Sequence, residues 1–122
     1  MAKILVVDDD FMIRNLLEEF LVGEGYDVIL ASNGEEALKK MKESPALVLL
    51  DIMMPDMHGL KVLDRIKEMA PSTEVIMVTG LNEHTVALEG IKRGAFDYIT
   101  KPIDLKHLGD VIGVKLLMIS TE

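Results

Sequence analysis

Five polar side chains stand at the ends of short, largely apolar runs in this sequence, and their chemical types suit phosphate chemistry. In chain order they are Asp8, Asp9, Asp51, Thr79 and Lys101. The runs that they follow or end are residues 4–7, 47–50, 75–78 and 98–100. Three carboxylates, one hydroxyl and one ammonium group are therefore available to a single site, provided that the four runs end side by side.

Three carboxylates within a few ångströms repel one another, so such a site needs a bound cation or a shared proton. The chain has no Cys, and oxygen ligands without Cys or a nearby His favour Mg²⁺. A carboxylate beside Mg²⁺ can attack a phosphoryl group and form an acyl phosphate. Lys101 and Thr79 can then stabilise charge on the phosphoryl oxygens. The set predicts phosphoryl transfer onto Asp51.

The runs themselves predict how these side chains are positioned. Short apolar runs bounded by turn residues are typical of strands buried on both faces of a parallel sheet. The sequence predicts five such strands, over residues 4–7, 26–31, 47–50, 74–79 and 96–100. In open α/β sheets the reactive groups lie just beyond the carboxyl ends of the strands, which is where Asp51 stands.

Helical patterns alternate with these strands, and five are predicted. They carry the stripe Ile13, Leu16, Leu17, Phe20 and Leu21; the segment 35–43; the stripe Leu60, Leu63 and Ile66; the segment 83–93; and the stripe Leu105, Leu108, Val111, Ile112 and Leu116. Asp10 is predicted to cap the first helix, Asn33 or Ser32 the second, and Asn82 the fourth. The alternation predicts an α/β protein with a parallel sheet covered on both faces by right-handed crossovers.

The composition narrows the class of protein. A chain of 122 residues, 49% of them hydrophobic, predicts a single domain over residues 1–122. The net charge of −8 argues against direct binding to a nucleic-acid backbone. The sequence shows neither a secretory signal nor the run of about 20 apolar residues that a membrane span needs, so a soluble cytoplasmic protein without a membrane partner is expected.

Each candidate also has an ordinary structural interpretation. Taken one at a time, they can be a solvated capping run (residues 8–10), a turn acid (Asp51), a locally bonded strand end (Thr79), a surface charge (Lys101) and a core aromatic residue (Tyr98). Asp56 and His58 are assigned to the loop rather than to the site. The joint placement of the candidates at strand ends favours a shared site.

The motifs around these residues resemble the receiver domains of two-component response regulators, as in the chemotaxis receivers. The matching stretches are ILVVDDD, LVLLDIMMPDMHG, VIMVTG and FDYITKP, and the resemblance extends from Lys3 to about Leu117. It implies a flavodoxin-like (βα)5 fold, a doubly wound parallel five-stranded sheet in the order 2-1-3-4-5 with five helices.

The resemblance also implies a role for each site residue. Asp51 accepts a phosphoryl group from a sensor histidine kinase or a phosphotransfer protein. Mg²⁺ is bound by Asp8, Asp9 as the direct ligand, Asp51 and the backbone carbonyl of Met53. Thr79 and Lys101 contact the phosphoryl group, Tyr98 changes rotamer with phosphorylation, and the Lys101–Pro102 peptide is cis.

By the same resemblance, the fourth helix, fifth strand and fifth helix form the signalling face. It passes the signal to a downstream effector or a covalently attached output domain, and FDYITKP is similar both to the receivers of transcription activators and to some single-domain members. Such a domain is a phosphoacceptor switch rather than an enzyme, although it catalyses its own phosphoryl transfer and a slow autodephosphorylation. Met53 and Leu81 stand at the two variable positions beside the phosphoryl group, and as apolar residues they cannot position a hydrolytic water.

Two other families use related chemistry or a related fold. A haloacid-dehalogenase-type phosphatase needs Asp-x-Asp-x-Thr/Val after a strand; residues 8–12 lack the last position, and 122 residues leave no room for its cap and later motifs. A flavodoxin-like electron carrier needs a Ser/Thr/Gly-rich phosphate loop after the first strand, and three acids there repel a flavin phosphate.

Overall fold

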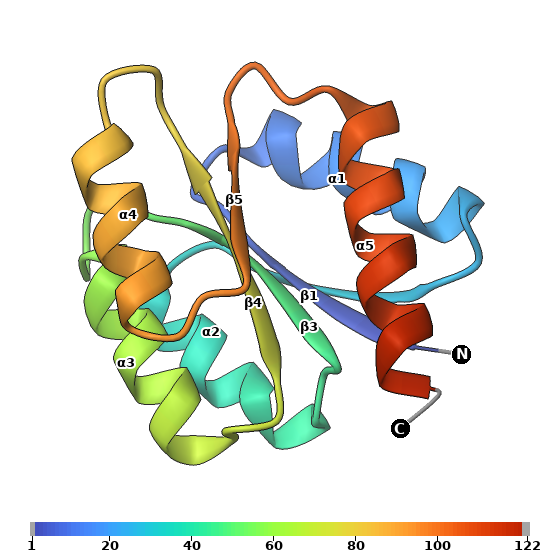
Figure 1. Ribbon diagram of the computed structural model, residues 1–122, viewed down its shortest axis with the longest axis horizontal. Helices are drawn as coiled ribbons and strands as arrows, with labels where there is room; N and C mark the ends of the chain where they lie inside the picture. Colours follow the sequence, from blue (N-terminus) through green and yellow to red (C-terminus); the bar gives the residue numbers. More distant parts are fainter. Residues whose placement is uncertain (1, 121–122) are drawn as a thin grey trace.

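Five parallel strands form one sheet, and their order is β2-β1-β3-β4-β5, as the resemblance implies (Figure 1). The computed structural model describes residues 2–120; Met1, Thr121 and Glu122 of the predicted domain lie outside the described residues. The strands are β1 (Lys3–Val7), β2 (Asp27–Ala31), β3 (Leu47–Asp51), β4 (Glu74–Thr79) and β5 (Asp97–Thr100). Asp51 pairs with Val78, and Thr79 pairs with Thr100, so the carboxyl ends of neighbouring strands lie level.

Helices cover both faces of the sheet (Figure 1). They are α1 (Phe11–Gly23), α2 (Gly34–Lys40), α3 (Gly59–Met69), α4 (His84–Lys92) and α5 (Leu105–Ser120), with a short 3₁₀ helix, η1 (Met41–Glu43), after α2. Helices α1 and α5 lie on one face, and α2, α3 and α4 lie on the other. Among the helices that the structure describes, none combines the length and apolar character needed to cross a membrane.

The sheet separates two apolar cores because successive side chains of a strand point to opposite faces. In β1, Ile4 and Val6 join the core under α1 and α5. Leu5 and Val7 join the core under α2 and α3. All five residues of β3 are buried, as expected for a central strand covered on both sides. This double burial fixes β3, and with it the position of Asp51.

Two of the three predicted helix caps are confirmed. The side chain of Asp10 accepts a hydrogen bond from the Met12 N–H, and that of Asn33 accepts one from the Glu36 N–H. The prediction for α4 is wrong, because Glu83 takes the N-cap position and makes no side-chain cap. Asn82 lies in the preceding turn.

Two further details differ from the sequence-based expectation. The predicted helix over 35–43 changes to 3₁₀ geometry after Lys40, where the chain tightens before Ser44 in the left-handed region (φ 55°). Leu16, predicted in the apolar stripe of α1, is 44% exposed. Leu17 and Leu21 form the buried edge of that stripe, so the helix turns a narrower face to the sheet than the pattern predicts.

Candidate functional site

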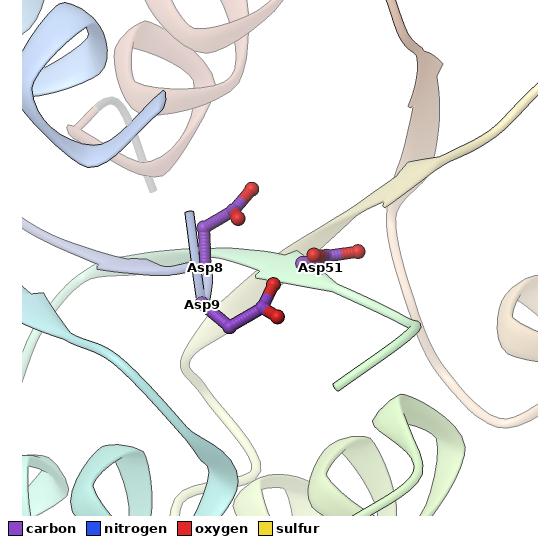
Figure 2. Close-up of side chains that lie close together, drawn as sticks. All are labelled: Asp8, Asp9 and Asp51. Atoms are coloured by element: carbon purple, nitrogen blue, oxygen red, sulfur yellow. The ribbon is translucent and has the colours of Figure 1, made fainter. Parts of the chain in front are cut away.

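Three aspartates meet at the carboxyl ends of β1 and β3. Asp8 and Asp9 directly follow β1, and Asp51 is the last residue of β3. Each offers a carboxylate oxygen, and these oxygens lie within 4.8 Å of one another (Figure 2). Asp8 and Asp51 are only 2% and 5% exposed, whereas Asp9 is exposed. The structure therefore brings together the three acids that the strand ends predict.

Backbone groups hold the two buried carboxylates in place. The Asp10 N–H donates to Asp8 Oδ1 at 2.9 Å, and the Met53 N–H donates to Asp51 Oδ1 at 3.2 Å. Arg14 adds a hydrogen bond of 2.8 Å from Nη1 to the Asp8 carbonyl oxygen. Each carboxylate has one oxygen fixed by the backbone, and the other is available to the site.

Lys101 brings a cation to the remaining oxygens. Its Nζ lies 3.1 Å from Asp8 Oδ2 and 3.4 Å from Asp51 Oδ2. The lysine directly follows β5, and its N–H donates to the Thr79 carbonyl oxygen at 2.7 Å, which ties this end of β5 to β4. The Lys101–Pro102 peptide is cis, as the resemblance implies.

Burial and charge shift the pKa values of this group. Burial raises the pKa of Asp51 to about 6; the Met53 N–H opposes that rise, the charge of Asp8 adds to it, and Lys101 opposes it. Burial alone would lower the pKa of Lys101, but the charges of Asp51 and Asp8 outweigh it and raise the pKa above its usual value. At neutral pH the pocket therefore holds one firmly charged ammonium among carboxylates.

Such a group of oxygen donors could hold a metal ion. Hard divalent cations take carboxylate oxygens, and three carboxylates with only one ammonium leave excess negative charge that a cation would neutralise. The arrangement, with two buried acids and one exposed acid, fits an ion that keeps part of its water shell. The carboxylates, and not a His or Cys, make up this donor set.

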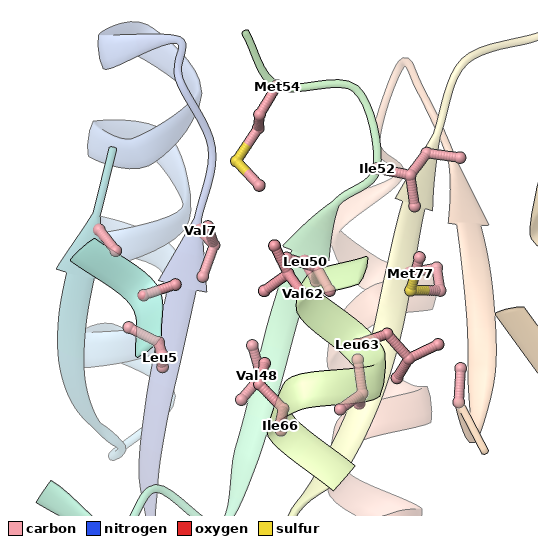
Figure 3. Packing of buried hydrophobic residues seen from close by; sticks show 14 of the residues in the cluster. Leu5, Val7, Val48, Leu50, Ile52, Met54, Val62, Leu63, Ile66 and Met77 are labelled. Atoms are coloured by element: carbon pink, nitrogen blue, oxygen red, sulfur yellow. The ribbon is translucent and has the colours of Figure 1, made fainter. Parts of the chain in front are cut away.

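The loop after β3 is anchored by buried side chains on either side of an exposed one. Ile52 and Met54 enter the core, where Figure 3 shows them beside Met77 and Val7, while Met53 is 55% exposed. The Met53 backbone is thereby kept beside Asp51. Gly59, which begins α3, closes the loop by donating its N–H to the Ile52 carbonyl oxygen at 2.9 Å.

Thr79 and Tyr98 lie on the strands beside this pocket. Thr79 is buried at the end of β4, and its hydroxyl lies 3.5 Å from the Ile99 carbonyl oxygen. Tyr98 is half-buried on β5, with its hydroxyl 3.4 Å from Nδ1 of His84 on α4. The two rings meet edge to face, with centroids 6.1 Å apart. Tyr98 thus connects β5 to the first residue of α4.

Two acidic residues near the site act in ways that the sequence did not indicate. Asp56 caps α2 from the loop after β3, since its carboxylate accepts hydrogen bonds from the Gly34 and Glu35 N–H groups at 3.0 and 3.1 Å. The Gly34 contact is the main reason that its pKa is lowered. Glu83 accepts a hydrogen bond from the Gly80 N–H. The Asp56 contact joins residues 22 positions apart, so no local motif could reveal it.

Known proteins resemble this chain in sequence and in fold. Probable transcriptional regulator ycf27 of Pyropia yezoensis is 47% identical over 107 residues, which cover 87% of this chain and 44% of ycf27. The alkaline phosphatase synthesis transcriptional regulatory protein PhoP of Bacillus subtilis (strain 168) is 45% identical over 107 residues, covering 87% of this chain and 45% of PhoP. The matched segment thus spans less than half the length of these relatives.

The crystal structure of a CheY-like response regulator receiver domain protein from Methanospirillum hungatei JF-1 has a TM-score of 0.94 and 34% identity, covering 99% of this chain and 98% of that chain. The family model for the response regulator receiver domain matches residues 4–113. Since that segment includes the three aspartates and every strand residue except Lys3, the chain belongs to the family of response regulator receiver domains.

Proposed function

We propose that this receiver domain accepts a phosphoryl group on Asp51 from the phosphohistidine of a sensor histidine kinase or a phosphotransfer protein. The observation that carries the assignment is the position of Lys101, whose Nζ lies 3.4 Å from Asp51 Oδ2 and 3.1 Å from Asp8 Oδ2. An ammonium group there can hold a phosphoryl oxygen once the group is attached. A receiver domain is not a classical enzyme, and the proposed self-catalysis concerns this one transfer and the slow hydrolysis of the acyl phosphate that it forms.

In the proposed step, a carboxylate oxygen of Asp51 forms a bond to phosphorus while the phosphorus–nitrogen bond of the phosphohistidine breaks. The electron pair of the broken bond stays on the imidazole nitrogen, and Asp51 becomes an acyl phosphate. The carboxyl group must be ionised to attack, and a pKa of about 6 leaves it mostly ionised at neutral pH. The Met53 N–H orients it through the hydrogen bond to Oδ1.

We propose Mg²⁺ as the cofactor, held by the carboxylates of Asp8, Asp9 and Asp51 and the backbone carbonyl of Met53, with Asp9 as a direct ligand. When bound, the ion would supply positive charge against the phosphoryl oxygens. The donor set supports this choice, because all its groups are oxygens and one of its acids is open to solvent.

The proposed signal leaves the pocket through Thr79 and Tyr98. Thr79 lies at the end of β4, where its hydroxyl can turn to the phosphoryl group, and Tyr98 packs against the start of α4. A rearrangement of these two side chains would change the face formed by α4, β5 and α5, which we propose as the signalling face.

The domain's partners are proposed on the same basis. The relatives named above are transcriptional regulators of about twice this length, which supports a covalently attached output domain or a separate downstream effector. We propose that this domain itself contacts neither nucleic acid nor membrane and that it works in the cytoplasm. The acyl phosphate is proposed to hydrolyse slowly, because the apolar, exposed side chains of Met53 and Leu81 offer no hydrogen bond to water.

Labelling with acetyl phosphate tests whether Asp51 is the phosphoacceptor. With Mg²⁺ the wild-type protein should gain the mass of one phosphoryl group, measured by intact-mass spectrometry, and it should gain none in excess chelator. Asp51→Asn should gain none under either condition. Asp27→Asn, which removes an exposed acid at the start of β2, should be labelled like the wild type. Full labelling of Asp51→Asn would refute the assignment.

A further inference from the structure

Two hydrogen bonds between Gly80 and Glu83 close the turn between β4 and α4. The Gly80 N–H donates to Oε1 of Glu83, and the Glu83 N–H donates to the Gly80 carbonyl oxygen at 3.2 Å. A carboxylate that accepts from a backbone N–H makes a charge-assisted hydrogen bond, which is roughly twice as strong as a neutral one. Glu83 also stands at the N-cap position of α4, yet its side chain makes no cap there. The carboxylate reaches back to the strand end instead.

The Gly80 N–H belongs to the side of the strand that faces β3. At the end of β4 the backbone groups alternate: the Val78 carbonyl oxygen accepts from the Ile52 N–H beside β3, and the Thr79 carbonyl oxygen accepts from the Lys101 N–H beside β5. The next backbone donor, the Gly80 N–H, points again to the β3 side, where Asp51 is the last residue of the strand. This donor thus lies on the side of β4 that faces the strand of Asp51, and Glu83 occupies it.

Glycine at position 80 is what leaves room for this contact. A Cβ atom added to Gly80 would lie 2.7 Å from Glu83 Oε1, and the three nearest atoms to it all belong to the Glu83 side chain. An alanine would therefore meet only the flexible end of that side chain and would displace the carboxylate. The contact can thus be broken from either partner.

We propose that Glu83 is a positioning residue that occupies the Gly80 N–H in the resting protein and competes for it with the phosphoryl group on Asp51. This inference rests on the proposed function. The carboxylate is an anion that substitutes for a phosphoryl oxygen at this donor until Asp51 is phosphorylated. Its departure releases the N-cap residue of α4, so occupation of the pocket changes the start of the signalling helix.

The resting contact can be tested without any phosphoryl donor. In metal-free protein the Gly80 amide proton should resonate downfield, as expected for a charge-assisted hydrogen bond, and Glu83→Gln should move it upfield because the carboxamide is a weaker, neutral acceptor. Glu89→Gln is the matched control. It removes one negative charge from the same helix, where Glu89 pairs with Arg93 and not with Gly80. An unchanged Gly80 resonance in Glu83→Gln would overturn the proposal.

The competition is tested by the initial rate of labelling with acetyl phosphate and Mg²⁺. Glu83→Gln should raise the rate roughly threefold to tenfold, as expected when a charge-assisted hydrogen bond is replaced by a neutral one. Gly80→Ala should also raise the labelling rate, although it keeps the negative charge of Glu83. An increase in both variants would therefore show that Glu83 acts by occupying the Gly80 N–H and not by repelling the phosphoryl donor. Glu89→Gln should leave the rate unchanged.

The outcomes separate this inference from the function on which it rests. Normal labelling of the wild type on Asp51, with rates for Glu83→Gln and Gly80→Ala that equal or fall below it, would overturn the role of Glu83 alone. A wild type that is labelled at other residues but not on Asp51 would overturn the proposed function and this inference together.

Discussion

The surroundings of Asp51 shift its pKa in opposite directions. Burial favours the protonated carboxyl and raises its pKa to about 6, whereas the Met53 N–H and Lys101 favour the ionised form. The balance keeps this buried carboxyl group mostly ionised at neutral pH. The same lysine contacts Asp8, so a single cation serves two buried acids.

Lys101→Ala should block switching more than phosphorylation. The ammonium group is proposed to hold the phosphoryl oxygens after transfer, so its loss should leave labelling of Asp51 detectable while the phosphorylated domain stays near its resting conformation. The measurement is the change in amide chemical shifts around Tyr98 when acetyl phosphate and Mg²⁺ are added. Lys106→Ala removes an exposed lysine of α5 and should switch normally. A full shift change in Lys101→Ala would show that the lysine is not needed for switching.

The placement of the site residues was predictable from the sequence for a simple reason. Each follows or ends an apolar run, and parallel strands bring such ends to one edge of the sheet. Glu83 was not predictable, because its carboxylate bonds backwards to Gly80 rather than capping the helix that it precedes. A pattern along the chain identifies which residue begins a helix but not which way its side chain turns.

At the scale of elements, the loop after β3 links the pocket to two helices. Its Asp56 caps α2, and its last contact, from the Gly59 N–H to the Ile52 carbonyl oxygen, begins α3. Strand order and the alternation of strands and helices followed from hydrophobic pattern and resemblance. The start of α2 depends on a carboxylate from another loop, which local propensity cannot reveal.

Gly59→Ala should destabilise the domain. A Cβ atom at this position would lie 2.3 Å from the Ile52 Cα atom, so the backbone of the loop or of α3 has to move. We expect the free energy of unfolding to fall by about 2 kcal/mol, as for other overpacked sites. Urea denaturation curves of Gly59→Ala and the wild type measure this change in the free energy of unfolding.

Gly113→Ala is the control for this change. A Cβ atom at Gly113, within α5, meets nothing within 4 Å, so alanine there should stabilise the helix by about 0.5–1 kcal/mol. Equal midpoints for Gly59→Ala and the wild type would show that the loop tolerates the side chain.

At the scale of the whole molecule, the acidic pocket lowers stability when no cation is bound. The folded-state pKa of Asp51 is raised from 3.8 to about 6, so the folded protein binds a proton more tightly than the unfolded chain. The resulting stabilisation is fully present below about pH 4 and is lost as the pH rises through about 6. Above that pH the ionised group costs about 3 kcal/mol, from 1.36 kcal/mol per pKa unit.

Asp51→Asn, in chelator at pH 7, should therefore unfold at higher urea concentration than the wild type, and the difference should vanish near pH 4. Saturating Mg²⁺ should narrow the gap at pH 7, because the wild type gains more from the ion; at 100 times the dissociation constant the gain is about 2.7 kcal/mol. Asp27→Asn should follow the wild type throughout. A wild type more stable than Asp51→Asn without metal would contradict a shared acidic pocket.

The pocket draws on strands that are far apart in the chain. Its residues come from the ends of β1, β3, β4 and β5, and the last of them, Lys101, stands 93 positions after Asp8, the difference between their residue numbers. A nascent chain that has not yet added β5 carries Asp51, the proposed acceptor, but lacks the lysine that faces it. Because that lysine is proposed to couple phosphorylation to switching, a phosphoryl group gained by such a chain would produce no signal.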